Sequence, residues 1–219
     1  METIGVEELC RRYEQVYVAA VSDALDARGY WHQALDSGLQ PLNCGTKLAG
    51  PAFTMFGSPN RTTDKSLRKS PRAVDELAPL SVVVMGTSGD PITGHWGELL
   101  TNAAVYRKCR GAVVDGGIRD TAFIRELGFP IYYRFHSPRD ASGRWNLIDY
   151  QCPVEAGGVL ITPGDFIVGD DDGIVVVPRE LVVDVLLEAE AIVNTEKEIR
   201  QRVREGQSVA ELYMEYERF

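Results

Sequence analysis

Two short apolar segments on either side of a helical segment constrain the fold of this chain most strongly. Residues 80–85 (LSVVVM) and 112–115 (AVVD) are rich in β-branched residues, and residues 97–110 (GELLTNAAVYRKCR) between them have the composition of a helix. A connection of this length is typical of parallel strands, because antiparallel neighbours need only a short turn. The sequence therefore predicts a strand–helix–strand unit within an α/β fold.

Helices are predicted at both ends of the chain. Residues 6–28 and 179–205 carry apolar residues at three- and four-residue spacing, with a break expected near residues 18–22, and a shorter helix is predicted over residues 209–216. Between residues 154 and 177, short β-rich runs alternate with Gly, Pro and Asp, which is typical of antiparallel hairpins.

Length and charge limit the classes of function. A chain of 219 residues fits one large domain, so we expect a single domain over residues 1–219 with a C-terminal helical extension over about residues 179–219. The net charge of −9 disfavours nucleic acid as a partner, and no apolar run approaches the roughly 18 residues that cross a bilayer. The first residues are acidic and polar, unlike a signal peptide. These features predict a cytoplasmic protein that binds neither nucleic acid nor a membrane.

Charged residues follow both strands of the predicted strand–helix–strand unit. Glu98 opens the helix after the first strand, and Arg119 and Asp120 follow the second strand, with twenty residues between Glu98 and Arg119. Because ligands bind at the carboxyl ends of strands in open α/β sheets, we expect these side chains to meet there. The backbone N–H groups of Glu98, Leu99 and Leu100, in the first turn of the helix, would suit a small carboxylate. A carboxylate beside a guanidinium offers a hard-cation ligand next to a group that stabilises an oxyanion.

Several segments resemble one known family. They are GELLTNAA, GAVVDGGIRD and GGVLITPGDFIVGDDDGIVVVP, and the similarity begins at residues 21–29 (VSDALDARG) and extends to the C-terminal helix. The family comprises 4-hydroxy-4-methyl-2-oxoglutarate and 4-carboxy-4-hydroxy-2-oxoadipate aldolases and their relative, the regulator of ribonuclease E activity A. The resemblance implies a three-layer α/β/β swivelling fold, assembled as a homotrimer or homohexamer with sites at subunit boundaries. It also implies a divalent-metal-dependent class II aldolase that cleaves a 4-hydroxy-2-oxo acid to pyruvate and often decarboxylates oxaloacetate.

The resemblance also implies roles for individual residues. Asp120 matches the direct metal ligand, Arg119 the residue that contacts the pyruvyl oxygen, and Glu98 an outer-sphere acid. Gly97, together with the amides of the turn that follows it, matches the segment that binds the substrate carboxylate.

The alternative function is that of a non-enzymatic regulator that binds a protein partner, like the regulator of ribonuclease E activity A. Such regulators resemble the aldolases but lack a C-terminal acid that completes the active site. Glu196 and Glu198, on the predicted C-terminal helix, offer this acid across a subunit boundary. The comparison with the family does not decide between Glu196 and Glu198, and we favour Glu198. The presence of these two acids favours an enzyme over a regulator.

The chemistry of the reaction favours a metal independently. Retro-aldol cleavage stores electrons on a 2-oxo group as an enolate, which takes either a lysine Schiff base or a metal beside a cation. None of the five lysines lies in an apolar strand interior, where burial would lower its pKa. One carboxylate with several waters suits Mg²⁺ or Mn²⁺ better than zinc.

Simpler roles are open for several of these residues. Asp120 is also a favourable N-cap for a helix that starts at residue 121, and Arg119 could form an ordinary surface ion pair. The dipeptide His95–Trp96 either shapes the pocket or packs within a loop. The basic segment over residues 61–72 is either a solvated loop or a lid that attracts a di- or tricarboxylate.

Overall fold

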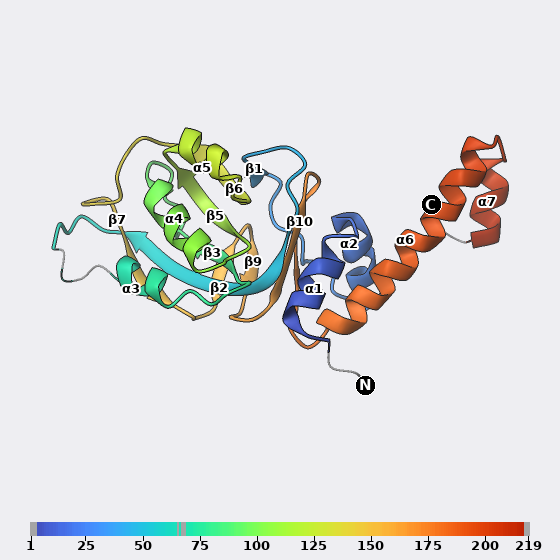
Figure 1. Ribbon diagram of the computed structural model, residues 1–219, viewed down its shortest axis with the longest axis horizontal. Helices are drawn as coiled ribbons and strands as arrows, with labels where there is room; N and C mark the ends of the chain where they lie inside the picture. Colours follow the sequence, from blue (N-terminus) through green and yellow to red (C-terminus); the bar gives the residue numbers. More distant parts are fainter. Residues whose placement is uncertain (1–3, 65, 67–68, 217–219) are drawn as a thin grey trace.

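The structure, a computed structural model, describes residues 4–64, 66 and 69–216 (Figure 1). Nine of its strands form one mixed sheet, and two more form a separate hairpin. The main path through the sheet is β1 (Gln40–Pro41), β6 (Ile131–His136), β5 (Gly111–Ile118), β3 (Val82–Gly86), β2 (Leu48–Pro59), β10 (Phe166–Asp170) and β11 (Gly173–Val177). The strand β4 (Gly94–Trp96) pairs with β5, β7 (Trp145–Tyr150) pairs with β2, and the hairpin is β8 (Val154–Ala156) with β9 (Val159–Ile161).

The described part of the chain contains seven helices. They are α1 (Val6–Tyr13), α2 (Val18–Asp26), α3 (Ser70–Asp75), α4 (Glu98–Tyr106), α5 (Thr121–Leu127), α6 (Val182–Arg204) and α7 (Val209–Tyr216). None of these helices combines the length and the apolarity that a membrane span requires.

The predicted strand–helix–strand unit is confirmed. β3 and β5 pair in parallel, with Val82 opposite Gly111 and Val84 opposite Val113, and α4 lies in the connection between them. Every residue of β3 is buried, as expected for a strand covered on both faces. The parallel run continues to β2 on one side and to β6 on the other. The carboxyl ends of β5 and β6 therefore meet at one edge of the sheet, and this edge carries the candidate site.

Three packed layers confirm the α/β/β expectation. On one face of the sheet, α3, α4 and α5 enclose an apolar core that includes Trp96, Ile118 and Ile124. On the other face, the hairpin of β8 and β9 covers a second core that includes Val84 and Val113. The alternation of side chains along β3 and β5 divides their residues between these two cores.

The terminal helices form a third cluster at the β10–β11 end of the sheet. Both α1 and α2 pack with the first part of α6 against β10 and β11. The remainder of α6 extends away from the sheet, and α7 folds back along it (Figure 1). We call this distal part of α6, residues 193–204, together with α7, the C-terminal arm.

The break in the first helix lies earlier than predicted. The sequence suggested a break near residues 18–22, whereas α1 ends at Tyr13 and α2 begins at Val18. The backbone N–H of Val18 donates to the Asp170 carboxylate of β10, at 3.0 Å. A side chain that is distant in sequence therefore fixes the start of α2.

The basic segment differs in part from its prediction. Residues 70–75 form the helix α3 rather than continuing a loop, with Pro71 in its first turn, where the absent N–H of proline costs nothing. Lys65 and Arg68 lie outside the described residues. Lys69 pairs with Asp149 at 3.3 Å, and Arg72 pairs with Glu76 at 2.9 Å.

Candidate active site

A cavity of about 330 Å³ lies where the carboxyl ends of β4 and β5 meet the start of α4. Its walls are the turn at Arg119 and Asp120, the first turn of α4, the first residues of α3 and the segment 140–146. Gly97, Leu99 and Leu100 line it together with Arg119 and Asp120. The topology thus brings together residues that the sequence placed on two separate strand ends.

Asp120 adopts a backbone conformation that its own helix does not require. It precedes α5 with φ 57° and ψ 33°, in the left-handed region, and within the described chain its carboxylate caps no amide of α5. Instead, the Oδ2 atom accepts the backbone N–H of Glu98 at 3.3 Å, at the start of the neighbouring helix α4. Asp120 thus occupies the N-cap position of α5 without the side-chain hydrogen bond that the capping alternative expected, because its carboxylate accepts an N–H of α4 instead.

Arg119 is fixed at its backbone and faces two carboxylates with its side chain. Its N–H donates to the carbonyl oxygen of Trp96 at 2.9 Å, which joins the end of β5 to the end of β4. The guanidinium lies 3.6 Å from Asp120 and 3.5 Å from Asp140. With 36 % of its side chain exposed, Arg119 retains donor capacity toward the cavity.

Asp140 is a site residue that the sequence reasoning missed. It lies in the segment after β6, which is parallel to β5, so both strands deliver their following residues to the same edge of the sheet. The signal was available in the sequence SPRDASGRW, residues 137–145, which follows β6. Recognition of this signal required the knowledge that β6 is the neighbour of β5 in the sheet.

Gly97 allows the start of α4 to lie close to Arg119 and Asp120. A Cβ atom at this position would lie 2.6 Å from Oδ2 of Asp120 and 3.1 Å from Cγ of Arg119. Gly97 is also the N-cap residue of α4, and its carbonyl accepts the Thr101 hydroxyl at 3.0 Å. The absence of a side chain at Gly97 thus lets the Arg119–Asp120 turn contact the start of α4 directly.

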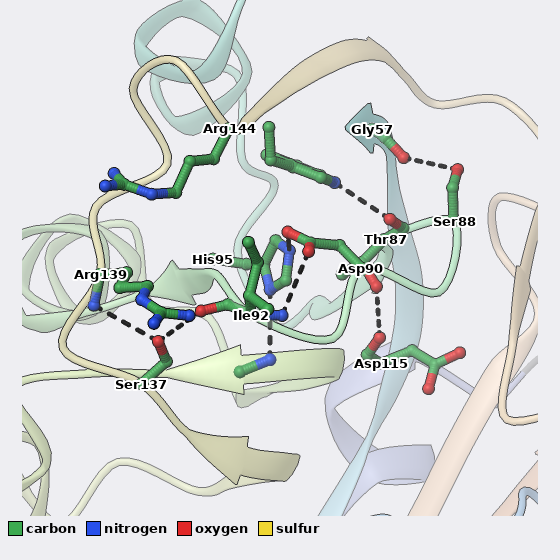
Figure 2. Close-up of polar contacts among 12 residues, drawn as sticks. Gly57, Thr87, Ser88, Asp90, Ile92, His95, Asp115, Ser137, Arg139 and Arg144 are labelled. Carbon is green, nitrogen blue, oxygen red and sulfur yellow. Dashed lines mark hydrogen bonds and ion pairs between the residues drawn. The ribbon is translucent and has the colours of Figure 1, made fainter. Parts of the chain in front are cut away.

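His95 and Trp96 are both buried beneath the cavity. The Nε2 atom of His95 lies 3.1 Å from the Asp90 carboxylate (Figure 2). The indole N–H of Trp96 donates to the Thr101 hydroxyl at 2.8 Å, which ties β4 to the first turn of α4. Burial lowers the pKa of His95, although the Asp90 carboxylate opposes this shift. Both residues therefore support the cavity, and both contribute to its lining.

Glu196 and Glu198 do not approach Asp120 within one chain. Glu196 accepts the Tyr17 hydroxyl, and Glu198 accepts the Tyr216 hydroxyl at 2.7 Å. Both acids lie on the C-terminal arm, on the far side of the molecule from α4 and α5 (Figure 1). A role for either acid at this cavity would require the arm of a second subunit.

A divalent cation would find two carboxylates at the cavity wall, those of Asp120 and Asp140, both of which pair with Arg119. Among the described residues, no group of three or more His, Cys, Asp or Glu side chains gathers as a metal cage. Asp120 offers an oxygen ligand at the cavity wall, 40 % exposed. This arrangement suits Mg²⁺ or Mn²⁺, which commonly bind one or two carboxylates and complete their shells with water and substrate oxygens.

Comparison with known proteins identifies the family. The model of the RraA-like family (Aldolase/RraA) matches residues 18–176. The chain belongs to the RraA-like family. The match includes the whole cavity and ends before α6, so the C-terminal arm lies outside the segment that defines RraA-like proteins here.

Among RraA-like relatives, DlpA of Legionella pneumophila is 31 % identical over 198 residues, or 90 % of this chain, although the chain spans only 32 % of the length of DlpA. The protein named "Putative 4-hydroxy-4-methyl-2-oxoglutarate aldolase" of Halalkalibacterium halodurans is 32 % identical over 178 residues, covering 81 % of this chain and 80 % of that protein. In three dimensions, RraAS2 of Streptomyces coelicolor, described as an unusual member of the RNase ES inhibitor RraA family, matches with a TM-score of 0.81 and 33 % identity over 91 % of this chain and 98 % of its own. The RraA-like family thus includes proteins with an aldolase name and proteins with an inhibitor name.

Proposed function

We propose that this RraA-like protein is a divalent-metal-dependent aldolase that cleaves a 4-hydroxy-2-oxo acid to pyruvate. The observation that carries the proposal is the placement of Asp120, which holds a left-handed backbone conformation and directs its carboxylate away from its own helix, beside Arg119. Of the five non-glycine residues with positive φ in the described chain, Asp120 is the one that lines the cavity, and such residues cluster at functional sites. The aldolase name of the Halalkalibacterium halodurans relative supports the same assignment.

Four residues of the cavity have distinct roles in this proposal. Mg²⁺ or Mn²⁺, held by Asp120, would polarise the 2-oxo group of the substrate. The Arg119 guanidinium donates to the oxygen on which negative charge develops, and a planar fork of donors is suited to that task. The amides of Leu99 and Leu100, in the first turn of α4, bind the substrate carboxylate at the positive end of the helix.

Proton transfer is assigned to Glu98 and water. Glu98 is half-buried at the start of α4, and its own amide contacts the Asp120 carboxylate. Cleavage between C3 and C4 requires removal of the proton from the 4-hydroxyl and, afterwards, protonation of C3 to give the methyl group of pyruvate. The same enolate arises when oxaloacetate loses CO₂, so decarboxylation of oxaloacetate is a second expected activity.

The test is pyruvate formation from a series of 4-hydroxy-2-oxo acids and from oxaloacetate. Turnover should disappear after treatment with EDTA and return with Mg²⁺ or Mn²⁺, and the Asp120→Asn variant should need much more metal for half-maximal rate. The protein should also exchange the methyl protons of pyruvate with deuterium from the solvent. Turnover that survives thorough chelation, or trapping of pyruvate on the protein by borohydride, would refute the metal mechanism. A folded protein that is inert toward the whole series would favour the regulator alternative.

A further inference from the structure

His95 joins three segments that surround the cavity. Its imidazole is fully buried, with Nδ1 3.1 Å from the backbone nitrogen of Gly117 in β5 and Nε2 3.1 Å from the Asp90 carboxylate. The edge of its ring meets Trp145 of β7, with 4.9 Å between centroids and 79° between the planes. The indole N–H of Trp145 donates to the carbonyl of Thr87, at the start of the loop that carries Asp90.

The contact with Gly117 replaces a missing part of the sheet. β4 pairs with β5 at Gly94–Gly117 and at Trp96–Ile118, and the register shifts between these pairs, at the position of His95. On its other side, β5 shifts register against β6 between Val114 and Gly117. A bulge leaves backbone groups without regular ladder partners, and a buried N–H without an acceptor is costly. The imidazole Nδ1 supplies the acceptor for the Gly117 N–H.

Only one residue, Ile118, separates Gly117 from the proposed catalytic pair of Arg119 and Asp120. Beyond Gly117, the chain continues through Ile118 to Arg119, whose N–H returns to the carbonyl of Trp96. On the opposite strand, His95 is followed by Trp96 and then by Gly97, the N-cap residue of α4. The His95–Gly117 bond therefore lies just before β4 and β5 separate, where β4 leads into α4 and β5 leads to Arg119 and Asp120.

We propose that His95 is a positioning residue, which sets the place of Arg119 and Asp120 relative to the start of α4. The proposal deepens the proposed aldolase function and uses its turnover as one readout. His95 does not act on the substrate in this scheme. Its effect reaches the reaction through the alignment of the Arg119 guanidinium with the amides of α4, and displacements near 1 Å at such a site cost about 10²-fold in rate.

The contacts also specify the protonation state of the ring. Because a backbone N–H can only donate, Nδ1 must be the acceptor, and the single ring proton resides on Nε2, which donates to Asp90. The charged groups that face the ring are Asp90 from its loop and Asp115 from β5, whereas β7 presents the uncharged indole of Trp145. Burial outweighs both carboxylates and lowers the pKa of His95.

Acid should therefore disrupt this alignment. A second proton, on Nδ1, would oppose the Gly117 N–H and remove its acceptor. The unfolded chain takes up that proton at a higher pH than the folded chain, so the stabilisation by His95 is complete above the ordinary histidine pKa and is lost as the pH falls below it. Turnover is expected to fall at lower pH, where the folded protein itself takes up the proton, because burial lowers the pKa of His95.

The experiment compares three substitutions that separate the two hydrogen bonds. His95→Asn keeps an acceptor near the position of Nδ1, His95→Gln keeps a donor near the position of Nε2, and His95→Leu keeps neither. We expect the Leu and Gln variants to lose about 10²-fold in kcat with little change in KM, and the Asn variant to recover to within about tenfold of the wild type. The acidic decline of kcat should be absent from the Asn variant. The control is His32→Gln, which removes an exposed imidazole and should leave the kinetics unchanged.

A measurement without turnover keeps this inference separate from the proposed function. Hydrogen exchange of the Gly117 amide should be slow in the wild type and the Asn variant, and faster in the Gln and Leu variants. Nitrogen NMR of the ring should show the proton on Nε2. If no substrate is turned over but exchange follows this order, the proposed function fails and the positional role of His95 stands. Equal protection of Gly117 in all variants, or an Asn variant as impaired as the Leu variant, would overturn the inference.

Discussion

The cavity end of the sheet and the C-terminal arm are held together by different kinds of interaction. Beneath the cavity, the contacts are buried and directional, as in the hydrogen bond from Gly117 to His95 and the one from Trp96 to Thr101. On the arm, Arg202 of α6 pairs with Glu215 of α7 at 2.7 Å, and Glu215 is 52 % exposed. Exposed pairs of this kind contribute little to stability. The contrast indicates that the cavity depends on exact placement, whereas the arm needs only to remain helical and docked at its base.

The base of the arm explains how such a weakly fixed element stays in place. The buried residues of α6 are concentrated in its first half, from Val182 to Ile192, where the helix packs with α1 and α2. Beyond that point, the buried apolar residues of the described arm are Ile199 in α6 and Leu212 in α7. Substitutions should therefore have steeply different consequences in the two regions.

The largest effect is expected at Arg119. Arg119→Lys should lower kcat by about 10²-fold or more, equivalent to about 3 kcal/mol, because a point charge cannot replace a planar fork aimed at a developing oxyanion. Initial rates on the best substrate measure this loss. The thermal midpoint controls for loss of folding, and it should change little because the side chain is partly exposed. A lysine variant with near-normal kcat would remove Arg119 from the mechanism.

The next effect is expected at Gly97. Gly97→Ala places a methyl group 2.6 Å from the Asp120 carboxylate, which must then move away from the start of α4. We expect a loss of about 10- to 100-fold in kcat/KM. The matched control is Gly5→Ala, where the added methyl group meets no atom within 4 Å. If both variants behave alike, the close approach at Gly97 has no functional value.

A smaller effect is expected from the acids of the arm. If the arm of one subunit completes the site of another, Glu198→Ala or Glu196→Ala should lower turnover by about tenfold, as is typical for residues that orient metal-bound water. Glu205→Ala, near the end of the same helix, is the control. Mixing the Glu198→Ala and Asp120→Asn proteins should restore part of the activity, since hybrid oligomers regain intact sites. Light scattering should report a trimer or a hexamer, and a fully active monomer would refute the shared site.

The smallest effect is expected at Arg202. Arg202→Gln removes the ion pair with Glu215 and a hydrogen bond to Tyr216, both near the surface. We expect unchanged turnover and a slightly lower thermal midpoint, with the difference decreasing as salt screens the pair in the wild type. A large loss of activity would show that the arm is positioned as precisely as the cavity.

The sequence predicted those elements whose signals are local. The unit formed by β3, α4 and β5 follows from β-branched runs on either side of a helical one, and α7 matches its predicted range, residues 209–216. The strand β7 was missed because its sequence, WNLIDY, alternates poorly and its pairing with β2 is distant in sequence. The short strand β4 was missed because three residues carry no periodicity.

The residues of the site likewise divide into those with a local signal in the sequence and those whose position depends on distant strand pairing. The expectation that Arg119 and Asp120 lie near Glu98 needed only the parallel topology. The conformation of Asp120 was beyond reach, because N-cap preference pointed to its own helix, and the competing contact with the start of α4 exists only after β4 and β5 have paired. Asp140 was missed for the related reason that its position depends on which strand neighbours β5.

The left-handed backbone of Asp120 affects which substitutions at this position would raise the stability of the protein. An L-residue pays roughly 1 kcal/mol for that conformation, and glycine would adopt it without penalty. Selection for thermal stability alone would thus favour glycine at position 120, at the cost of the carboxylate. Under the proposed function, position 120 is one where activity and stability compete, and a stability-guided library should hold it fixed.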